Sequence, residues 1–286
     1  QLFKLAGFNF SIAHCNFNLR ANEAQRDEAF VKLLADDMGV PFHVVHFDTK
    51  AFAEQNRIST QMAARQLRYE WFDALREQYH YQYVAVAHHQ NDAIETVLLN
   101  LVRGTGISGM HGILPKRGRL IRPLLFLSRQ EIDDIVASHN FSFVEDSSNQ
   151  SSKYARNKIR LNVIPHLREI NPRLEETFAE NIHRFAETEV LVQSVVAEKR
   201  NQLFIQERGD IVIDIKELAA LQPQKLLFFE LLKPLNFTSS VVDEILSSLD
   251  KQSGTSFYSS THRLTVDRDR LVISPLVEKT QELYYL

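Results

Sequence analysis

The feature that most constrains the fold is an alternation of short apolar segments with longer helical patterns over the first half of the chain. Residues 8–14, 42–48 and 83–89 are rich in β-branched and aromatic side chains, and each is short enough for one strand. Between them, residues 22–38 and 59–78 carry apolar side chains at helical spacing. Because such an alternation is typical of a parallel sheet covered by helices, we predict an α/β, doubly wound, mainly parallel fold.

The same alternation continues to about residue 140. A third helix is predicted to begin near Asn91 and to end before a run of glycines. Residues 119–125 predict a fourth strand at the edge of the sheet. Ser128 and Glu131 have the spacing of a capping box, so they mark the start of a further helix.

The second half is organised differently. A long helix is predicted from Pro172 to about Gln206, and its length suits a connector. A small α+β module follows, built from a strand at 210–215, helices at 223–233 and 238–249, and a β-hairpin at 262–274.

These patterns divide the chain into three parts. A length of 286 residues is too great for one ordinary domain, and an apolar fraction of 44% is enough for two cores. We predict an α/β catalytic domain at 1–172, a linker helix at 173–208 and a small α+β domain for substrate binding at 209–286.

Composition excludes several classes of protein. No stretch of 18 apolar residues could span a bilayer. The single cysteine, Cys15, excludes an internal disulfide framework and a four-cysteine metal site, so we expect a cytoplasmic protein. A net charge of -3 argues against general coating of nucleic acid, although an enzyme that binds one folded RNA needs only a local basic face. A homodimer is compatible with the sequence.

Three functional side chains lie where the third strand gives way to a helix. Asp92 follows His88 by four residues and Glu95 follows Asp92 by three, so all three are predicted to share one helix face. Ligands of open parallel sheets bind beyond the carboxyl ends of the strands. A plain capped helix explains the two acids equally well, because acids favour the positive end of the helix dipole. A metallohydrolase centre is a third interpretation, weakened because no matching second cluster of His and Asp occurs.

The loop from Arg103 to Gly112 contains a formal G-x-G-x-x-G pattern. A dinucleotide fingerprint must follow a strand and open a helix, whereas this pattern follows a helix. Two interpretations stay open. The glycines let the backbone approach a phosphate or ribose, or they merely end the helix.

Two groups of basic residues are candidates for phosphate contacts. Arg65 and Arg68 are three residues apart on one helix face, although such a pair is more often simply solvated. A polar loop leads into the second group, which suits contacts with phosphates but is also common on soluble surfaces. Its members are Lys153, Tyr154, Arg156, Asn157, Lys158 and Arg160.

In order and spacing, several motifs between residues 13 and 160 resemble those of the tRNA(Ile)-lysidine synthetases, whereas the second half resembles this family only loosely. The motifs are AHCNFNLR (13–20), AARQLRY (63–69), AHHQNDAIETVLLNLVRGTG (87–106), LIRPLL (120–125), and VEDSSN followed by RNKIR (144–160).

The resemblance implies an ATP-dependent ligase of the N-type ATP pyrophosphatase, or PP-loop, fold. ATP would adenylate O2 of the wobble cytidine at position 34 of a tRNA(Ile) with a CAU anticodon, and pyrophosphate would leave. The ε-amine of free L-lysine would then displace AMP. The product, lysidine, pairs with A rather than G, so the codon read changes from AUG to AUA.

The resemblance also implies roles for individual residues. Asp92 and Glu95 would hold lysine or a magnesium ion, with His88 beside them. Arg68 and Arg160 would face a phosphate or the activated cytidine.

Two further sets of contacts are implied. ATP would lie against Ala13, His14 and Asn16 at its adenine and ribose, and against Arg103 and Gly104 in the glycine loop. The tRNA would contact Lys153, Arg156, Asn157 and Arg160.

One family motif does not occur. The phosphate loop of pattern S-G-G-x-D-S joins the first strand to the first helix, and the chain begins at what would be the end of that helix. We therefore expect roughly 40 residues before Gln1 and no ATP turnover by this chain alone. A further domain could also follow Leu286.

Two alternatives stay open. One is another tRNA-modifying PP-loop enzyme, although thiolases of the cysteine-pair or cluster type need more cysteines than Cys15 supplies. The other is a non-catalytic RNA-binding protein, in which the basic loop binds RNA and Asp92 and Glu95 are structural.

Overall fold

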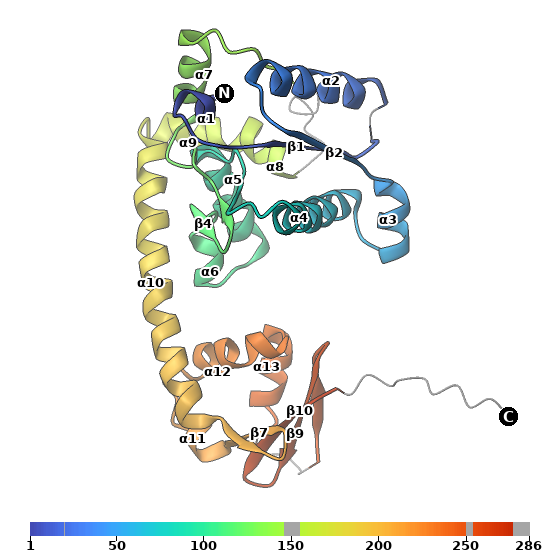
Figure 1. Ribbon diagram of the computed structural model, residues 1–286. Helices are drawn as coiled ribbons and strands as arrows, with labels where there is room; N and C mark the ends of the chain where they lie inside the picture. The colour runs from blue at the N-terminus through green and yellow to red at the C-terminus, as the bar shows by residue number, and fades with distance from the viewer. Residues whose placement is uncertain (20, 146–154, 250–253, 277–286) are drawn as a thin grey trace, which may run out of the picture. The chain divides into compact units, whose positions relative to one another are not determined.

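The computed structural model describes residues 1–19, 21–145, 155–249 and 254–276. The chain divides into two compact units, Gln1–Ala186 and Glu187–Leu286 (Figure 1). The helix α10 (Leu174–Leu203) runs through the boundary between them. None of the described helices is long and apolar enough to cross a membrane.

The first unit alternates strands and helices to residue 138, as the sequence predicts. Its strands are β1 (Ile12–Asn16), β2 (Phe42–His46), β3 (Val84–Ala85), β4 (Lys116–Arg117) and β5 (Leu120–Ile121). Its helices before α10 are α1 (Leu2–Leu5), α2 (Ala21–Met38), α3 (Thr49–Asn56), α4 (Thr60–Gln78), α5 (Gln90–Arg103), α6 (Ile107–Met110), α7 (Arg129–Ser138), α8 (Ala155–Lys158), the π-helical turn η2 (Ile159–Val163) and α9 (Ile164–Ile170).

The strands of the first unit form two hydrogen-bonded sets. The strands β1 and β2 are parallel from the pair Ile12 and Phe42 to the pair Asn16 and His46. In the other set, β5 lies between β3, which is parallel to it, and β4, which is antiparallel. The predicted edge position of the fourth strand is therefore wrong, because the turn after β4 folds a short strand back onto it.

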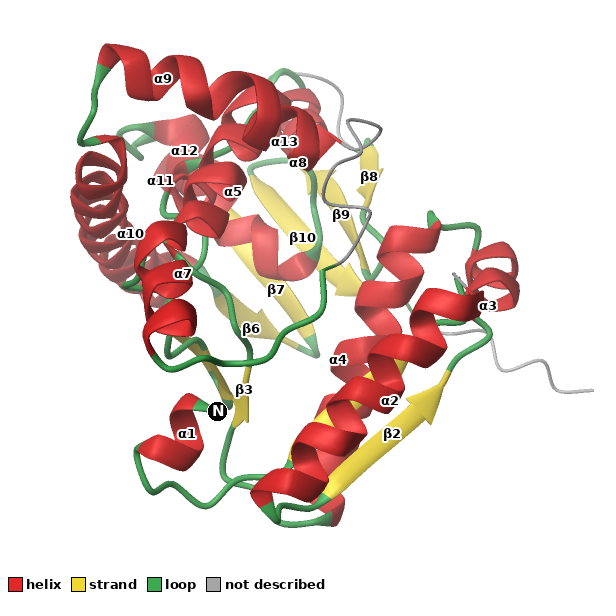
Figure 2. Ribbon diagram, turned by 90° about the horizontal axis from the view of Figure 1, so that it is seen from above, coloured by secondary structure: helices red, strands yellow, loops and turns green. Residues whose placement is uncertain are grey.

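Helices cover these strands where the sequence places them. The helix α2 packs along β1 and β2 (Figure 2). Ser59 is confirmed as the N-cap of α4, because its hydroxyl accepts the Met62 N–H at 3.2 Å. The capping box of α7 is confirmed as well: the Ser128 N–H donates to Glu131 Oε2 at 2.7 Å, and the Glu131 N–H donates to Ser128 Oγ at 3.2 Å.

A small apolar cluster fixes the part of the first unit that carries the predicted site. Ile94 on α5, Ile159 on η2, Ile164 on α9 and Leu174 on α10 are all buried against one another. Burial of these side chains holds α5 against the segment that follows residue 155, although the two are far apart in sequence.

The second unit is a five-stranded antiparallel sheet with helices. The strand order is β6-β7-β10-β9-β8. The predicted strand, helices and hairpin are all present, whereas the short elements β6, β8 and α11 were not predicted. The elements are β6 (Ile205–Glu207), β7 (Asp210–Asp214), α11 (Ile215–Ala219), α12 (Gln224–Leu232), the 3-10 turn η3 (Lys233–Leu235), α13 (Ser239–Leu246), β8 (Ser256–Tyr258), β9 (His262–Asp267) and β10 (Arg270–Pro275).

The core of the second unit lies between one face of this sheet and α12. Leu264 and Val266 on β9 alternate with more exposed residues, as expected for a strand with one buried face. Phe228 and Leu231 on α12 are fully buried against this face. The unit therefore has a hydrophobic core of its own.

Truncation of this core tests its contribution. Leu231→Ala should lower the free energy of unfolding by about 2–5 kcal/mol, because it removes a fully buried side chain and leaves a cavity. The matched control is Leu226→Ala on the same helix, since Leu226 is 40% exposed and its loss should cost less than about 0.5 kcal/mol. Urea unfolding of both variants measures the difference, and equal losses would contradict the described packing.

Candidate functional site

The candidate site begins at the loop between β3 and α5. The Val86 N–H donates to the Ile121 carbonyl at 3.0 Å, and the Gln90 N–H donates to the Leu127 carbonyl at 2.8 Å. These bonds fix both ends of the loop that carries His88 and His89. Because α5 begins at Gln90, His88 precedes the helix. The prediction that it shares a helix face with Asp92 and Glu95 is therefore wrong, and the loop positions it instead.

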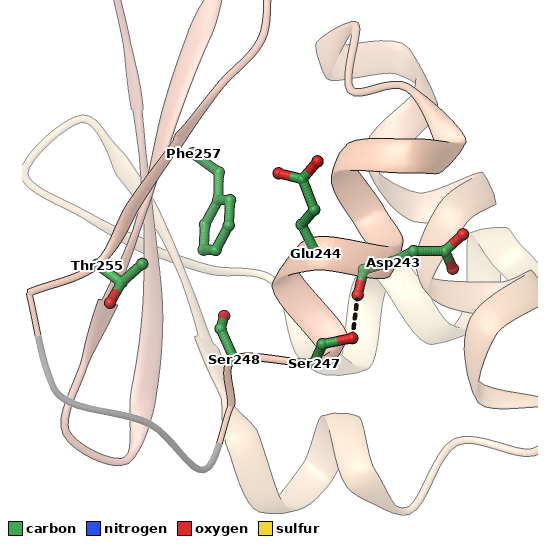
Figure 3. A pocket seen from close by; sticks show the side chains of 6 residues that line it. All are labelled: Asp243, Glu244, Ser247, Ser248, Thr255 and Phe257. Carbon is green, nitrogen blue, oxygen red and sulfur yellow. Dashed lines mark hydrogen bonds between the residues drawn. The ribbon is translucent and has the colours of Figure 1, made fainter.

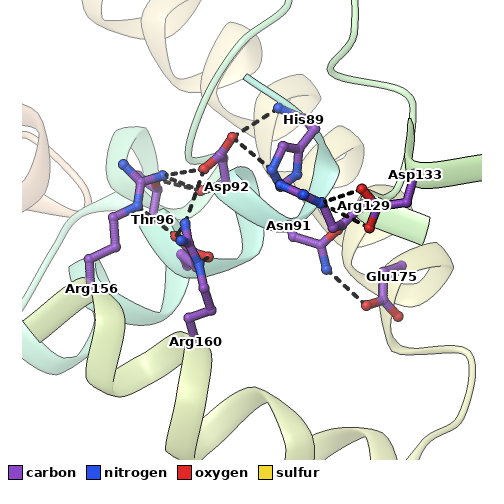
Figure 4. A network of polar contacts seen from close by, with 10 residues as sticks. His89, Asn91, Asp92, Thr96, Arg129, Asp133, Arg156, Arg160 and Glu175 are labelled. Atoms are coloured by element: carbon purple, nitrogen blue, oxygen red, sulfur yellow. Dashed lines mark hydrogen bonds and ion pairs between the residues drawn. The ribbon is translucent and has the colours of Figure 1, made fainter. Parts of the chain in front are cut away.

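Asp92 and Glu95 share one face of α5, as predicted, and two arginines cover that face (Figure 4). Glu95 is fully buried. Arg156 Nε donates to Glu95 Oε2 at 2.6 Å, and Arg160 Nε donates to Glu95 Oε1 at 2.5 Å. Arg156 Nη2 lies 3.2 Å from Asp92 Oδ1, and Arg160 Nη2 lies 3.7 Å from it. The structure thus joins two predicted catalytic acids to two predicted tRNA contacts.

Local structure explains how both arginines reach α5. They are four residues apart on α8 and η2, so they project from one face of the helical segment. Ile159 lies between them in sequence and packs against Ile94. The apolar contact therefore holds the segment that carries both arginines against α5.

The side-chain amide of Asn91 ties the start of α5 to two other helices. Asn91 Oδ1 accepts the Arg129 N–H at the start of α7, at 2.8 Å. Asn91 Nδ2 donates to Glu175 Oε1 on α10 at 3.1 Å, and Arg168 Nε donates to the same oxygen at 2.8 Å. Sequence reasoning missed Asn91, although a polar residue among apolar positions on a helix is a usable indication of such a role.

Burial favours the neutral form of the two histidines of the loop. Burial lowers the pKa of His88 and the pKa of His89, against the opposing charge of Asp92. In each ring, Nδ1 is buried and has no hydrogen-bond partner among the described residues. The His89 backbone N–H donates to Asp92 Oδ2 at 3.0 Å. The two imidazole rings therefore lie close to the acids, and His89 Nε2 is 3.5 Å from Asp92 Oδ2.

Arg122 is a second residue that sequence reasoning missed. It is buried, and burial lowers its pKa. Arg122 Nη1 donates to the Leu114 carbonyl at 2.6 Å. An arginine inside the apolar run LIRPLL is the sequence feature that could have indicated a buried cation.

Ala13, His14 and Asn16 lie on β1, as the sequence predicts. Asn16 is buried, and its Nδ2 donates to Glu28 Oε2 at 2.7 Å. That hydrogen bond is the main cause of the lowered pKa of Glu28, with a further contribution from His46 at 2.8 Å. Burial lowers the pKa of His14.

A hollow opens at the carboxyl ends of β1 and β2. Its volume is about 410 Å³, and its wall mixes amide, carboxylate, imidazole and ammonium groups. The lining residues are Asn16, Asn18, Gln25, Glu28, Ala29, Lys32 and His46.

Arg68 on α4 lies over the ring of Phe17, with 5.1 Å between its Cζ and the ring centroid. Phe17 directly follows β1, so Arg68 belongs to the β1 side of the unit. In the part of the chain that the structure describes, neither a hydrogen bond nor an ion pair joins Arg68 to Asp92. Arg65 lies over the ring of Tyr69 instead.

The remaining predicted site residues are more scattered. Arg103 and Gly104 end α5, about 16 Å along the helix from Asp92. The glycine loop contains the short helix α6, and Asn100 Nδ2 holds it by donating to the Gly109 carbonyl at 2.9 Å. Asn157 lies on α8 between the arginines. Lys153 lies outside the described residues.

A separate hollow of about 420 Å³ lies in the second unit, between α13 and β8 (Figure 3). Its polar groups are largely satisfied by the protein itself. Ser247 Oγ donates to the Asp243 carbonyl at 2.7 Å, and Ser248 Oγ donates to the Ile245 carbonyl at 2.8 Å. Lys225 Nζ lies 2.7 Å from Asp243 Oδ1. The hollow therefore offers a ligand fewer charged groups than the cluster on α5 does.

Among the described residues, no group of three or more His, Cys, Asp or Glu side chains is arranged to hold a metal ion. At Asp92 the neighbours are instead guanidinium groups.

Two family models match the chain. Residues 1–167 match the PP-loop domain, and residues 206–276 match the TilS substrate binding domain. Among solved structures, the U34-tRNA thiolase NcsA from Methanococcus maripaludis is similar in fold, with a TM-score of 0.52 and 14% identity over 63% of this chain and 62% of that one. The predicted fold class is confirmed by these matches.

Curated relatives match almost the whole chain. The tRNA(Ile)-lysidine synthase of Parabacteroides distasonis is 43% identical over 98% of this chain and 63% of its own length. The enzyme of the same name from Bacteroides thetaiotaomicron is 40% identical over 96% of this chain and 64% of its own length. The chain thus spans slightly less than two thirds of the length of these relatives. The PP-loop model matches more than half of the chain, so the chain, which also carries a match to the TilS substrate binding domain, belongs to the PP-loop family.

Proposed function

We propose that the protein containing this chain ligates L-lysine to C2 of the wobble cytidine of tRNA(Ile), with ATP converted to AMP and pyrophosphate. The observation that carries the proposal is the cluster of Asp92, Glu95, Arg156 and Arg160, which brings acids suited to an amine beside cations suited to RNA phosphate. The family of the chain and the names of its relatives support the same reaction.

Lysine needs an acid at this site for two reasons. Its ε-ammonium has a pKa of about 10.4 in water, so it arrives charged and cannot attack until it loses a proton. The Asp92 carboxylate would attract the ammonium and accept that proton. The amine then forms the C2–N bond as the bond from C2 to the adenylated oxygen breaks, and AMP leaves with that oxygen. The cations Arg160 and Arg68 would stabilise the negative charge on the departing phosphate.

ATP would bind at the hollow beyond β1 and β2. Its amide and imidazole groups, from Asn16 and His46, suit the hydrogen-bonding edges of a nucleoside, and Ala13 and His14 border it. Arg103 and Gly104 stay a prediction for a phosphate or ribose contact. Magnesium at Asp92 is poorly supported, because two guanidiniums lie within 4 Å of the same carboxylate oxygen.

The tRNA would contact the basic segment that includes Lys153, Arg156, Asn157 and Arg160. We also propose the division into a catalytic domain at 1–172, a linker helix at 173–208 and a substrate-binding domain at 209–286, which is supported by matches to two different family models. A cytoplasmic location suits a tRNA-modifying enzyme, and a homodimer stays a prediction.

Sulfur transfer by a cysteine is less well supported. Burial raises the pKa of Cys15, the only cysteine of the chain, to about 11. Its thiol is therefore protonated at neutral pH and is a poor nucleophile.

Asp92→Asn tests the role of the acid. In the intact protein, lysine incorporation into a tRNA(Ile) transcript should fall by at least about 100-fold, because the amide can neither pair with the ammonium nor accept its proton. Affinity for the same transcript should be retained. Incorporation of radiolabelled lysine at saturating ATP measures the change, and unaltered incorporation would remove Asp92 from the mechanism.

Removal of the arginines tests the RNA contact. Arg156→Ala and Arg160→Ala should each weaken tRNA binding and flatten its salt dependence by about one phosphate contact. The matched control is Arg184→Ala on α10, an exposed arginine that pairs with Glu180 within its own helix. Filter binding across a range of salt concentrations measures both quantities. Equal behaviour of all three variants would contradict the assignment.

A further inference from the structure

We infer that the hairpin of β4 and β5 is a second contact site for RNA phosphates, made by Lys116, Arg117 and Arg119 beside the ring of Tyr83. We call residues 116–121 the basic hairpin. It lies outside the cluster of acids and arginines on α5 and binds the anticodon arm of the same tRNA, so the inference rests on the proposed function and adds a site to it.

The basic hairpin lies in a part of the sequence that has no acids. The chain as a whole has 36 Asp and Glu against 33 Lys and Arg, yet residues 96–130 contain neither Asp nor Glu. The same segment carries six basic residues, which are Arg103, Lys116, Arg117, Arg119, Arg122 and Arg129. Half of them fall within the four residues of 116–119, so the positive charge of the segment is concentrated on the hairpin.

The three cations of the hairpin are exposed and are not neutralised by the protein. Within the described ranges, none of them forms an ion pair with a carboxylate. Arg129 and Arg173, by contrast, each pair with an acid on their own helix. Three like charges so close in sequence repel one another, and a bound anion relieves that repulsion. The hairpin therefore favours a ligand with several negative charges.

A neutral aromatic ring holds two of these cations. Lys116 Nζ lies 5.0 Å from the centroid of the Tyr83 ring, and Arg119 Cζ lies 5.9 Å from it. The face of an aromatic ring attracts a cation without cancelling its charge. Tyr83 directly precedes β3 and is 40% exposed, so the ring lies at the surface. Both cations are thus kept in place with their charge available to a ligand.

The backbone of the hairpin is fixed before any ligand binds. The Arg122 N–H donates to the Pro115 carbonyl at 2.8 Å, and the Val84 N–H donates to the Arg119 carbonyl at 2.9 Å. The turn has Gly118 at its first position with a φ of +60°, a conformation that glycine adopts without strain. Little backbone entropy is therefore lost when the hairpin binds a ligand.

The position of the hairpin favours RNA over an acidic protein as the ligand. Arg122 directly follows β5, and its charge adds to burial in lowering the pKa of His88, so it lies near the candidate site. Extended chain from Pro115 to Gly118 covers about 10 Å. With about 3.4 Å per nucleotide along a strand, the tip lies on the order of three nucleotides from a cytidine at the site. Arginine also matches phosphate with two parallel hydrogen bonds.

Neutralisation of the hairpin is the decisive experiment. In the intact protein, Lys116→Gln, Arg117→Gln and Arg119→Gln are combined, and filter binding of a tRNA(Ile) transcript is measured without ATP or lysine. The slope of log affinity against log salt should fall by about 2–3, the share of three phosphate contacts, and affinity at low salt should fall at least about tenfold. Because the three side chains are exposed, the thermal unfolding midpoint should not change.

Two controls separate phosphate contacts from a general effect of charge or folding. Arg173→Gln removes one exposed arginine that Glu176 already neutralises, so it should keep both the affinity and the slope. Tyr83→Leu keeps every charge but releases the cations. It should lower the affinity about two- to fivefold with the slope unchanged, whereas Tyr83→Phe, which retains the ring, should behave as the wild type.

Turnover and a second RNA complete the test. The triple variant should raise the KM for the transcript and keep kcat at saturating transcript, because phosphate contacts bind the ground state and the transition state alike. A transcript with an altered anticodon should lose affinity by the same factor, since phosphates carry no sequence information.

Three results would overturn the inference. They are an unchanged affinity and slope in the triple variant, as expected if the hairpin binds an acidic protein, a loss confined to the CAU anticodon, and a wild-type protein that binds no RNA. If the wild-type protein binds the transcript but does not incorporate lysine, the proposed function fails, and the salt slopes still decide the role of the hairpin.

Discussion

The first unit depends on one buried interaction, the Glu95 carboxylate held between two guanidiniums. An unpaired carboxylate at this depth would be strongly destabilising, so α5 can keep Glu95 only where α8 and η2 supply cations. The apolar contact of Ile94 with Ile159 brings the same elements together and contributes the favourable burial that the charged cluster alone does not provide. Packing and charge therefore favour the same arrangement of α5 and the α8–η2 segment. The two are distant in sequence, since Glu95 and Arg156 are 61 residues apart.

Local patterns in the sequence were enough to predict the long elements. Helical spacing and side-chain caps at Ser59 and Ser128 located α4 and α7, because both are properties of neighbouring residues. The short elements α3, α6 and α8 lack the length over which a period can be recognised. The interior position of β5 was missed for a different reason, since it depends on the return of β4 through a turn rather than on the composition of the strand.

In the candidate site, too, local patterns predicted single residues but not the contacts between distant segments. Asp92 and Glu95 were predicted from their spacing on one helix, and Arg156 and Arg160 from their place in a basic cluster. That the four side chains form one cluster could not be predicted, because no local pattern connects α5 to a segment so distant in sequence. The helix start at Gln90 also placed His88 in the preceding loop, where the backbone rather than a helical period sets its direction. Asn91 and Arg122 were missed because their partners lie on other elements.

The hydrogen bonds of the Asn91 side chain connect the first turn of α5 to α7 and α10. Through Glu175, that turn is attached to α10, a single continuous helix whose later residues belong to the second compact unit. The start of α5 is also packed on the start of α10, because Ile94 and Leu174 belong to one buried apolar cluster. One amide and one apolar contact therefore hold the turn that carries Asp92, and loss of either leaves the other in place.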